Sequence, residues 1–97
     1  MHASAMRVEL RVRDARSLKS KRMVVKSLTA HLRETFSVAV SEVDHNDLWQ
    51  RCALGIAAVA PQSGQVERIL QSVRRAIDSR QDVELLGWST THLEQPS

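Results

Sequence analysis

Residues 42–47, Glu-Val-Asp-His-Asn-Asp, bring together carboxylates and an imidazole, which are groups that bind metal ions or transfer protons. Their spacing matches no metal-ligand pattern, and in an extended strand Glu42 and His45 point to opposite faces. The segment from Asp44 to Asp47 is also rich in turn-forming residues. We therefore expect turn chemistry here, with no metal site and no cofactor.

The rest of the chain has no signature of catalysis. It has no nucleophile elbow, no glycine-rich phosphate loop and no HExxH motif. The single cysteine, Cys52, falls on the predicted buried side of a strand, where a thiol packs as a small, inert side chain. His31 falls at the edge of an apolar helix face and is expected to pack at the rim of the core. We expect a protein that is not an enzyme.

A line of cations on one predicted helix is the clearest functional feature. In residues 17–36, apolar positions with a period of 3.6 form one broad face. Beside it runs a basic stripe, about 20 Å long at 1.5 Å per residue, formed by Lys19, Arg22, Lys26 and Arg33. Arg16 and Lys21 add positive charge at the start of the helix. Such a line is suited to the phosphates of structured RNA, which give affinity and orientation without base specificity.

Charge is divided unevenly along the chain. Residues 1–36 hold nine Lys and Arg against three acidic residues, whereas residues 37–97 hold five against eight. The net charge is therefore +6 in the first part and −3 in the second. This asymmetry favours nucleic acid as a partner. The alternative is an ordinary solvated surface that happens to be basic.

Hydrophobic periodicity predicts the elements that position these residues. Strict alternation makes residues 6–13 a strand that buries Met6, Val8, Leu10 and Val12. Ser17 is the expected N-cap of the first helix. Three further strands are predicted over 37–43, 50–60 and 83–92, and a second amphipathic helix over 63–79. Gly87 within the last strand predicts a bulge or a close neighbour.

The predicted order is therefore β-α-β-β-α-β. Right-handed crossovers place both helices on one face of a four-stranded antiparallel sheet, with the first and third strands at its centre. This is the ferredoxin-like α+β sandwich. It forms a single domain over residues 1–97, in which 1–5 and 94–97 are expected to be flexible ends.

Composition is that of one small soluble domain. With 97 residues, 42% of them hydrophobic, the chain can bury a single core. No apolar run approaches the length of a membrane span, and no export signal precedes the first strand. A single cysteine rules out an internal disulfide and fits a reducing compartment. We expect a cytoplasmic protein that does not enter membranes.

The sheet face that the helices leave open has two possible uses. RNA-recognition modules of this topology stack bases on aromatic residues of the central strands, but here those strands present none. The third strand instead exposes Ala53, Gly55 and Ala57, a flat patch that a second sheet can approach closely. Trp49 and Trp88 are expected in the core or as interface anchors. A homodimer, or a protein-interaction module using the open face or the Trp49 hairpin, is the alternative to RNA contact.

Two segments resemble the motifs of a known family. RSLKSKR at residues 16–22 is similar to the RSLKxKR signature of the YlxP-like family of small bacterial proteins of unknown function, and SEVDHNDLWQR at residues 41–51 resembles the second signature of that family. The resemblance extends from about Met6 to Leu93. In the second signature, the motif positions without an assigned role are Glu42, His45, Asp47, Trp49 and Gln50.

The resemblance implies the same ferredoxin-like fold and supplies no catalytic residues. Relatives are often encoded beside genes for transcription termination, translation initiation and ribosome maturation. This neighbourhood implies a role close to the ribosome or its RNA. The resemblance and the basic stripe thus lead to the same expectation by independent routes.

Overall fold

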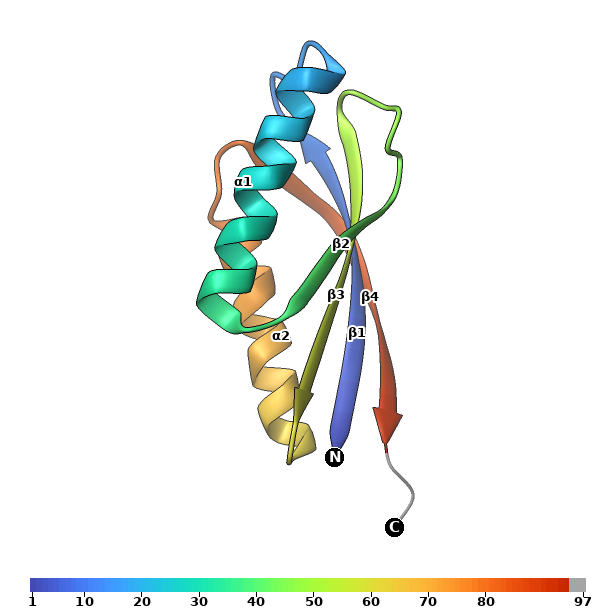
Figure 1. Ribbon diagram of the computed structural model, residues 1–97, viewed down its shortest axis with the longest axis vertical. Helices are drawn as coiled ribbons and strands as arrows, with labels where there is room; N and C mark the ends of the chain where they lie inside the picture. Colours follow the sequence, from blue (N-terminus) through green and yellow to red (C-terminus); the bar gives the residue numbers. More distant parts are fainter. Residues whose placement is uncertain (95–97) are drawn as a thin grey trace.

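A four-stranded antiparallel sheet carries both helices on one of its faces, as the computed structural model shows for residues 1–94 (Figure 1). The elements in chain order are β1 (His2–Val12), α1 (Leu18–Phe36), β2 (Ala39–Asp44), β3 (Arg51–Ala60), α2 (Ser63–Asp78) and β4 (Val83–Glu94). The strand order β2-β3-β1-β4 places β1 and β3 at the centre. The predicted ferredoxin-like α+β fold is confirmed. None of the helices within residues 1–94 is long and apolar enough to cross a membrane.

The core lies between the two helices and the sheet face beneath them. The alternation predicted for β1 is observed, since its four predicted core residues are at most 2% exposed. Helix α2 adds one apolar stripe of period 3.6. The largest fully buried apolar side chains are Met6, Leu10, Leu28, Leu32, Leu54, Ile56, Ile77, Val8, Val12, Val66 and Val73.

Helix α1 begins with the predicted N-cap. The Ser17 hydroxyl accepts a hydrogen bond from the Ser20 backbone N–H at 3.0 Å. In return, the Ser20 hydroxyl accepts one from the Ser17 backbone N–H at 3.2 Å. This reciprocal pair is a capping box in which serine replaces the usual glutamate. The first turn of α1 consequently contains no acidic residue.

The first residues of the chain belong to the sheet, contrary to the prediction of a flexible end. Residues 2–5 continue β1 and pair with both β3 and β4, whereas the sequence predicted an unpatterned end. The hydroxyl of Ser4, which is 6% exposed, lies 2.7 Å from His92 Nδ1 on β4. Small residues without alternation concealed this part of the strand from pattern analysis. The flexible end predicted over 94–97 is wrong at Glu94, which is the last residue of β4, and residues 95–97 lie outside the described residues.

Two irregularities interrupt the strand ladders. The register of β2 against β3 shifts between Glu42 and Asp44, which leaves Val43 as the extra residue of a bulge. The register of β4 against β1 shifts next to Gly87, as predicted from that glycine. No atom lies within 4 Å of a Cβ built on Gly87, so the bulge and not a close neighbour is the correct interpretation.

The open face is built from small side chains in its middle rows. The ladders align Ala39 of β2, Ala57 of β3, Ala5 of β1 and Thr91 of β4 in one row across all four strands. The patch predicted on β3 needs one correction, because Ala53 is 0% exposed although its side chain belongs to this face. Its partners across the ladders are Glu9 and Asp44, and both belong to a charged network described below.

Candidate functional site

A buried ammonium group joins the two signature segments of the sequence. Lys21 of α1 is 1% exposed, and its Nζ donates a hydrogen bond to the His45 backbone carbonyl at 2.6 Å. The same Nζ lies 2.8 Å from Glu42 Oε2 and forms an ion pair with that carboxylate. We call these two contacts the Lys21 bridge. The Lys21 bridge connects the first turns of α1 to β2 and to the loop that follows it. Figure 1 shows this loop beside the start of α1.

The burial of Lys21 corrects its assignment to an RNA-contacting surface. Lys21 precedes Leu28 by seven residues and Leu32 by eleven, so all three side chains leave α1 on its core side. Both leucines are at most 1% exposed. This spacing was the sequence signal that identifies Lys21 as an inward-facing cation. Its charge is already compensated by Glu42, so it is not a contact for phosphates.

The loop between β2 and β3 is held in shape by backbone hydrogen bonds. His45 has a φ of 63°, a left-handed conformation stabilised here because its N–H donates to Asp44 Oδ1 at 2.8 Å. The His45 carbonyl also accepts from the Leu48 N–H at 3.1 Å. At the other end of the loop, the Gln50 carbonyl accepts from the Val12 N–H at 2.9 Å. The turn predicted for residues 44–47 is present. Its hydrogen bonds also fix the backbone from which the exposed side chains of the loop extend.

A charged network of Arg7, Glu9, Asp44, His45 and Arg51 lies on the open face beside this loop. Arg7 donates to Glu9 Oε1 through Nε at 3.0 Å and through a terminal nitrogen at 2.8 Å, and it also lies 3.1 Å from Asp44 Oδ2. Glu9 Oε2 lies 3.1 Å from His45 Nε2 and 3.5 Å from the Arg51 guanidinium. The sequence did not reveal this cluster, because its members come from three strands of unknown register and from the loop after β2.

Hydrogen bonds within the network shift the pKa values of its carboxyl groups. The bond from Arg7 is the main reason that the pKa of Glu9 lies below its ordinary value, and His45 adds to the effect. The pKa of Asp44 is also lowered, first by the His45 backbone N–H and then by Arg7. Both groups are therefore carboxylates at neutral pH. The imidazole of His45 is on the open face and the carboxylate of Glu42 is on the helix face, as expected from their spacing.

The exposed cations of α1 differ from those of β1 in their partners. Arg7 and Arg11 of β1, and Arg13 just after it, each lie within 4.0 Å of a carboxylate oxygen, and Arg11 and Arg13 share the carboxylate of Glu84. By contrast, within residues 1–94 no carboxylate forms an ion pair with the exposed side chains of Arg16, Lys19, Arg22 and Lys26. Arg33, the last member of the basic stripe, is exposed but donates to the Val40 carbonyl of β2. The N-terminal part of the basic stripe, from Lys19 to Lys26, therefore carries positive charge that no ion pair within residues 1–94 compensates.

The remaining residues of the second signature form an exposed loop surface. Asp47, Trp49 and Gln50 are all exposed, and Trp49 retains 52% of its accessible surface. They line a shallow, open hollow together with Leu48 and Arg51. Trp88, by contrast, lies beneath the Arg74 guanidinium, which is 4.2 Å from the centre of the indole ring. Neither tryptophan is in the core.

The cysteine, the histidine of α1 and the potential metal ligands do not form a metal site in the described residues. Cys52 is 0% exposed, and burial is the main reason that the pKa of its thiol is raised to about 12, with Glu42 adding to the effect. His31 is exposed on α1, not packed at the rim of the core as expected. No group of three or more His, Cys, Asp or Glu side chains within residues 1–94 is arranged to hold a metal ion.

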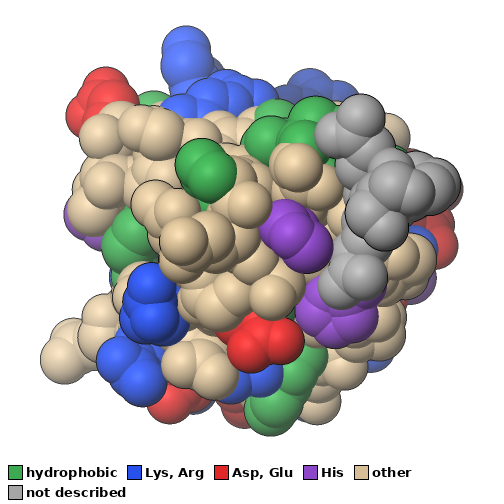
Figure 2. Space-filling model, turned by 90° about the horizontal axis from the view of Figure 1, so that it is seen from below, with side chains coloured by type: hydrophobic (Ala, Val, Ile, Leu, Met, Phe, Trp, Pro, Cys, Tyr) green, Lys and Arg blue, Asp and Glu red, His purple; other side chains and the backbone are tan. Residues whose placement is uncertain are grey.

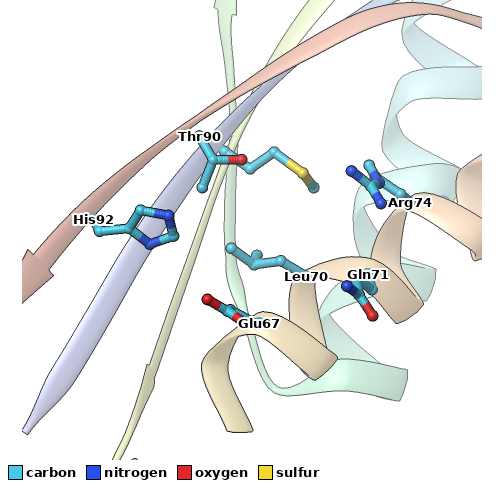
Figure 3. Close-up of a pocket in the computed structure, with 7 residues that line it drawn as sticks. Glu67, Leu70, Gln71, Arg74, Thr90 and His92 are labelled. Atoms are coloured by element: carbon cyan, nitrogen blue, oxygen red, sulfur yellow. The ribbon is translucent and has the colours of Figure 1, made fainter. Parts of the chain in front are cut away.

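The end of the molecule away from the loop carries a small hollow of about 170 Å³ between α2 and the sheet. Figure 3 shows Glu67 and Leu70 of α2 facing Thr90 and His92 of β4 across this space. Seen from that end, histidine side chains and an acidic side chain lie near the centre, and Lys and Arg lie toward the margins (Figure 2). No hydrogen bond joins Glu67 to His92 within residues 1–94, so Ser4, His92 and Glu67 form no proton relay.

Comparison with known proteins relates this arrangement to one family. The family described as "Protein of unknown function (DUF503)" matches residues 4–90, which include both signature segments and every strand and helix in at least part. An "Uncharacterized protein YlxP" from Bacillus subtilis (strain 168) is 44% identical over 71 residues, covering 73% of this chain and 77% of that protein. The resemblance stated from the two motifs is confirmed. The chain belongs to the DUF503 family, in which YlxP is a relative of similar length.

Proposed function

We propose that this protein contacts the phosphates of structured RNA, with ribosomal RNA as the source, through the exposed cations at the start of α1. The observation that carries the proposal is that, within residues 1–94, the exposed Arg16, Lys19, Arg22 and Lys26 form no ion pair, whereas Arg7, Arg11 and Arg13 each lie within 4.0 Å of a carboxylate oxygen. Surface cations that lack internal partners release counterions from nucleic acid when they bind it. The gene neighbourhood implied by the family resemblance favours ribosomal RNA over other structured RNA.

Helix polarity strengthens this proposal. The N-terminal end of a helix carries about half a unit of positive charge, and cations placed there reduce helix stability by about 0.3–1 kcal/mol each. The first turn of α1 nevertheless contains the exposed Lys19 and no acidic residue, whereas the charge of the buried Lys21 is compensated by Glu42. An anionic partner relieves this repulsion, because it interacts favourably with the helix end and with the side chains together.

A charge-reversal experiment tests the proposal. Binding of a structured RNA fragment is measured for the wild-type protein, for Lys19→Glu/Arg22→Glu on α1, and for Arg68→Glu/Arg75→Glu on α2. Both variants change net charge equally at exposed positions. We expect about a 10-fold or greater loss for the α1 variant alone, and affinity that falls steeply with salt. Equal losses for both variants would indicate non-specific attraction and contradict the proposal.

Association with ribosomes is tested separately in cells. We expect the protein to co-sediment with ribosomal particles and to be released when nuclease is added before sedimentation. A pull-down whose composition is unchanged by nuclease contradicts an RNA-mediated association. It would favour a protein partner instead.

Self-association through the open face is a second candidate function. The row of Ala39, Ala57, Ala5 and Thr91 presents small side chains at aligned positions, which allows another sheet to approach closely. Light scattering over a range of concentrations measures the oligomeric state. We expect Ala57→Arg to convert a dimer to a monomer, and a wild-type protein that is monomeric at high concentration excludes this candidate.

A further inference from the structure

We infer that Trp49 stacks on an unpaired base of the RNA whose phosphates contact α1, so that the preferred ligand is a single-stranded loop in structured RNA. The inference rests on the proposed function and deepens it, because it names the class of RNA that this end of the molecule fits. Aromatic side chains stack on bases of any identity, and unpaired bases are the ones accessible for this contact.

The first step concerns the accessibility of the indole. Trp49 is 52% exposed, and its neighbour Leu48 is 45% exposed. The chain contains three aromatic residues, and the other two are less suited to stacking. Arg74 covers one face of Trp88 at 4.2 Å, and Phe36 packs against the core at the far end of α1.

The second step concerns the rigidity of the loop. The Lys21 bridge holds the backbone at His45, and the Val12 N–H holds it at Gln50, which directly follows Trp49. The left-handed turn at His45 is stabilised by Asp44. Because the backbone is held on both sides of Trp49, little backbone conformational entropy is lost when a base stacks on the indole.

The third step concerns the distribution of charge. Asp47 lines the hollow beside Trp49 and would repel a phosphate placed there. Its carboxylate accepts hydrogen bonds from base amino groups, and the Gln50 amide can both donate and accept. The hollow thus fits a base, while the cations of α1 fit the backbone that carries that base.

The fourth step concerns the distance between these two surfaces. The loop lies beside the first turns of α1, and the Lys21 bridge is a direct contact between them (Figure 1). Lys19 and Arg22 flank Lys21 in sequence and are exposed. At 100° per residue these two cations lie on a different side of α1 from the buried Lys21, so an RNA strand that follows them must cross the start of the helix to reach the loop. A paired base in a duplex cannot turn toward the indole without being unstacked first.

The test compares two RNA probes. One is a hairpin whose stem closes a loop of about eight unpaired nucleotides, and the other is a duplex of the same stem sequence without a loop. Experiments use the Trp88→Phe variant, which leaves Trp49 as the single tryptophan. We expect the hairpin to quench Trp49 fluorescence and to bind more tightly than the duplex.

The deciding variant is Trp49→Ala. From the typical contribution of base–aromatic stacking, we expect about a 10- to 100-fold loss of affinity for the hairpin and little change for the duplex. Lys19→Glu/Arg22→Glu should weaken both probes, and Trp88→Phe neither. Circular dichroism checks that each variant is folded.

The outcomes separate this inference from the proposal beneath it. Equal binding of hairpin and duplex, unaffected by Trp49→Ala, overturns stacking and leaves the phosphate contact intact. Failure to bind either probe overturns the proposed function. If Trp49→Ala instead reduces self-association measured by light scattering, the loop between β2 and β3 is a protein contact and the stacking inference is wrong.

Discussion

Lys21 and His45 lie 24 residues apart in sequence, yet the ammonium nitrogen of the first is 2.6 Å from the carbonyl oxygen of the second. Lys21 belongs to the first family motif and His45 to the second. Their contact means that the two motifs form one structural unit, in which a cation inside the helix–sheet interface orients an exposed loop.

Replacing Lys21 by methionine should destabilise the protein substantially. The substitution leaves the Glu42 carboxylate without the cation that compensates it, and loss of one partner from a buried pair costs about 3–5 kcal/mol. We expect a loss near the lower end of this range, because Glu42 retains 23% of its side-chain exposure. Urea unfolding monitored by circular dichroism measures the change.

The exposed Lys19→Met variant is the matched control and should alter stability by no more than about 0.5 kcal/mol. Adding Glu42→Gln to Lys21→Met should recover part of the loss, because the unpaired charge is removed. Similar unfolding midpoints for Lys21→Met and Lys19→Met would contradict the structural role of the Lys21 bridge.

Stability should fall in acid as the network on the open face loses its charge. The pKa values of Glu9 and Asp44 are lower in the folded state than their ordinary values near 4. Their stabilising contribution is therefore complete above that range and disappears as the pH falls through the lowered folded-state values. Urea unfolding at pH 7 and at several values below pH 4 measures this dependence.

Arg7→Met should make the acid-dependent loss smaller, because Arg7 is the main cause of the lowered pKa of Glu9. Arg22→Met removes one positive charge from a side chain that forms no ion pair within residues 1–94, and it serves as the control. NMR titration of the Glu9 side chain should show a higher pKa in Arg7→Met than in the wild type. An unchanged titration in that variant would refute the assignment.

The thiol of Cys52 should be unreactive in the folded protein. Its pKa of about 12 leaves very little thiolate at pH 8, and the side chain is 0% exposed. We expect modification by a disulfide reagent to be at least about 100-fold slower than in urea. In a Cys52→Ala background, Met23→Cys provides an exposed thiol on α1 that should react rapidly. Rapid reaction of native Cys52 would mean that the core opens readily at β3.

Two glycines of the sheet should respond differently to alanine. Gly87 has no positive φ and open space where a Cβ would lie. Gly87→Ala should therefore stabilise the protein by about 0.5 kcal/mol, because alanine lowers the conformational entropy of the unfolded chain. At Gly55 an added Cβ would lie 3.0 Å from Val43 Cγ1. Gly55→Ala should therefore bring no such gain unless Val43→Ala accompanies it. Equal changes at both positions, measured by thermal unfolding, would contradict this packing.

Periodicity predicted the fold because burial in a two-layer structure repeats with the secondary structure. The alternation from Met6 to Val12 and the spacing of apolar residues in both helices are observed as expected. Residues 2–5 were missed because small side chains carry little hydrophobic signal, although their backbone pairs on both sides.

The candidate site was predictable only in part. The exposure of Lys19, Arg22 and Lys26 follows from their positions around α1. The same helical spacing places Lys21 on the buried side, but its charge led to the prediction that it was exposed. The charged network depends on the register of β1 against β3 and on the bulge at Val43. These are set by tertiary pairing, so no local pattern brings Arg7 and Asp44 together.

The pairing of the first and last strands has a mechanical consequence. β1 and β4 are antiparallel neighbours, and His2 lies opposite Glu94 in their register. Tension applied between these two ends would therefore open the ladder one hydrogen bond at a time, instead of loading all its bonds together. Under force the domain should separate at low load by unzipping from this edge of the sheet, and β4 should peel away before the Lys21 bridge at the other end is strained.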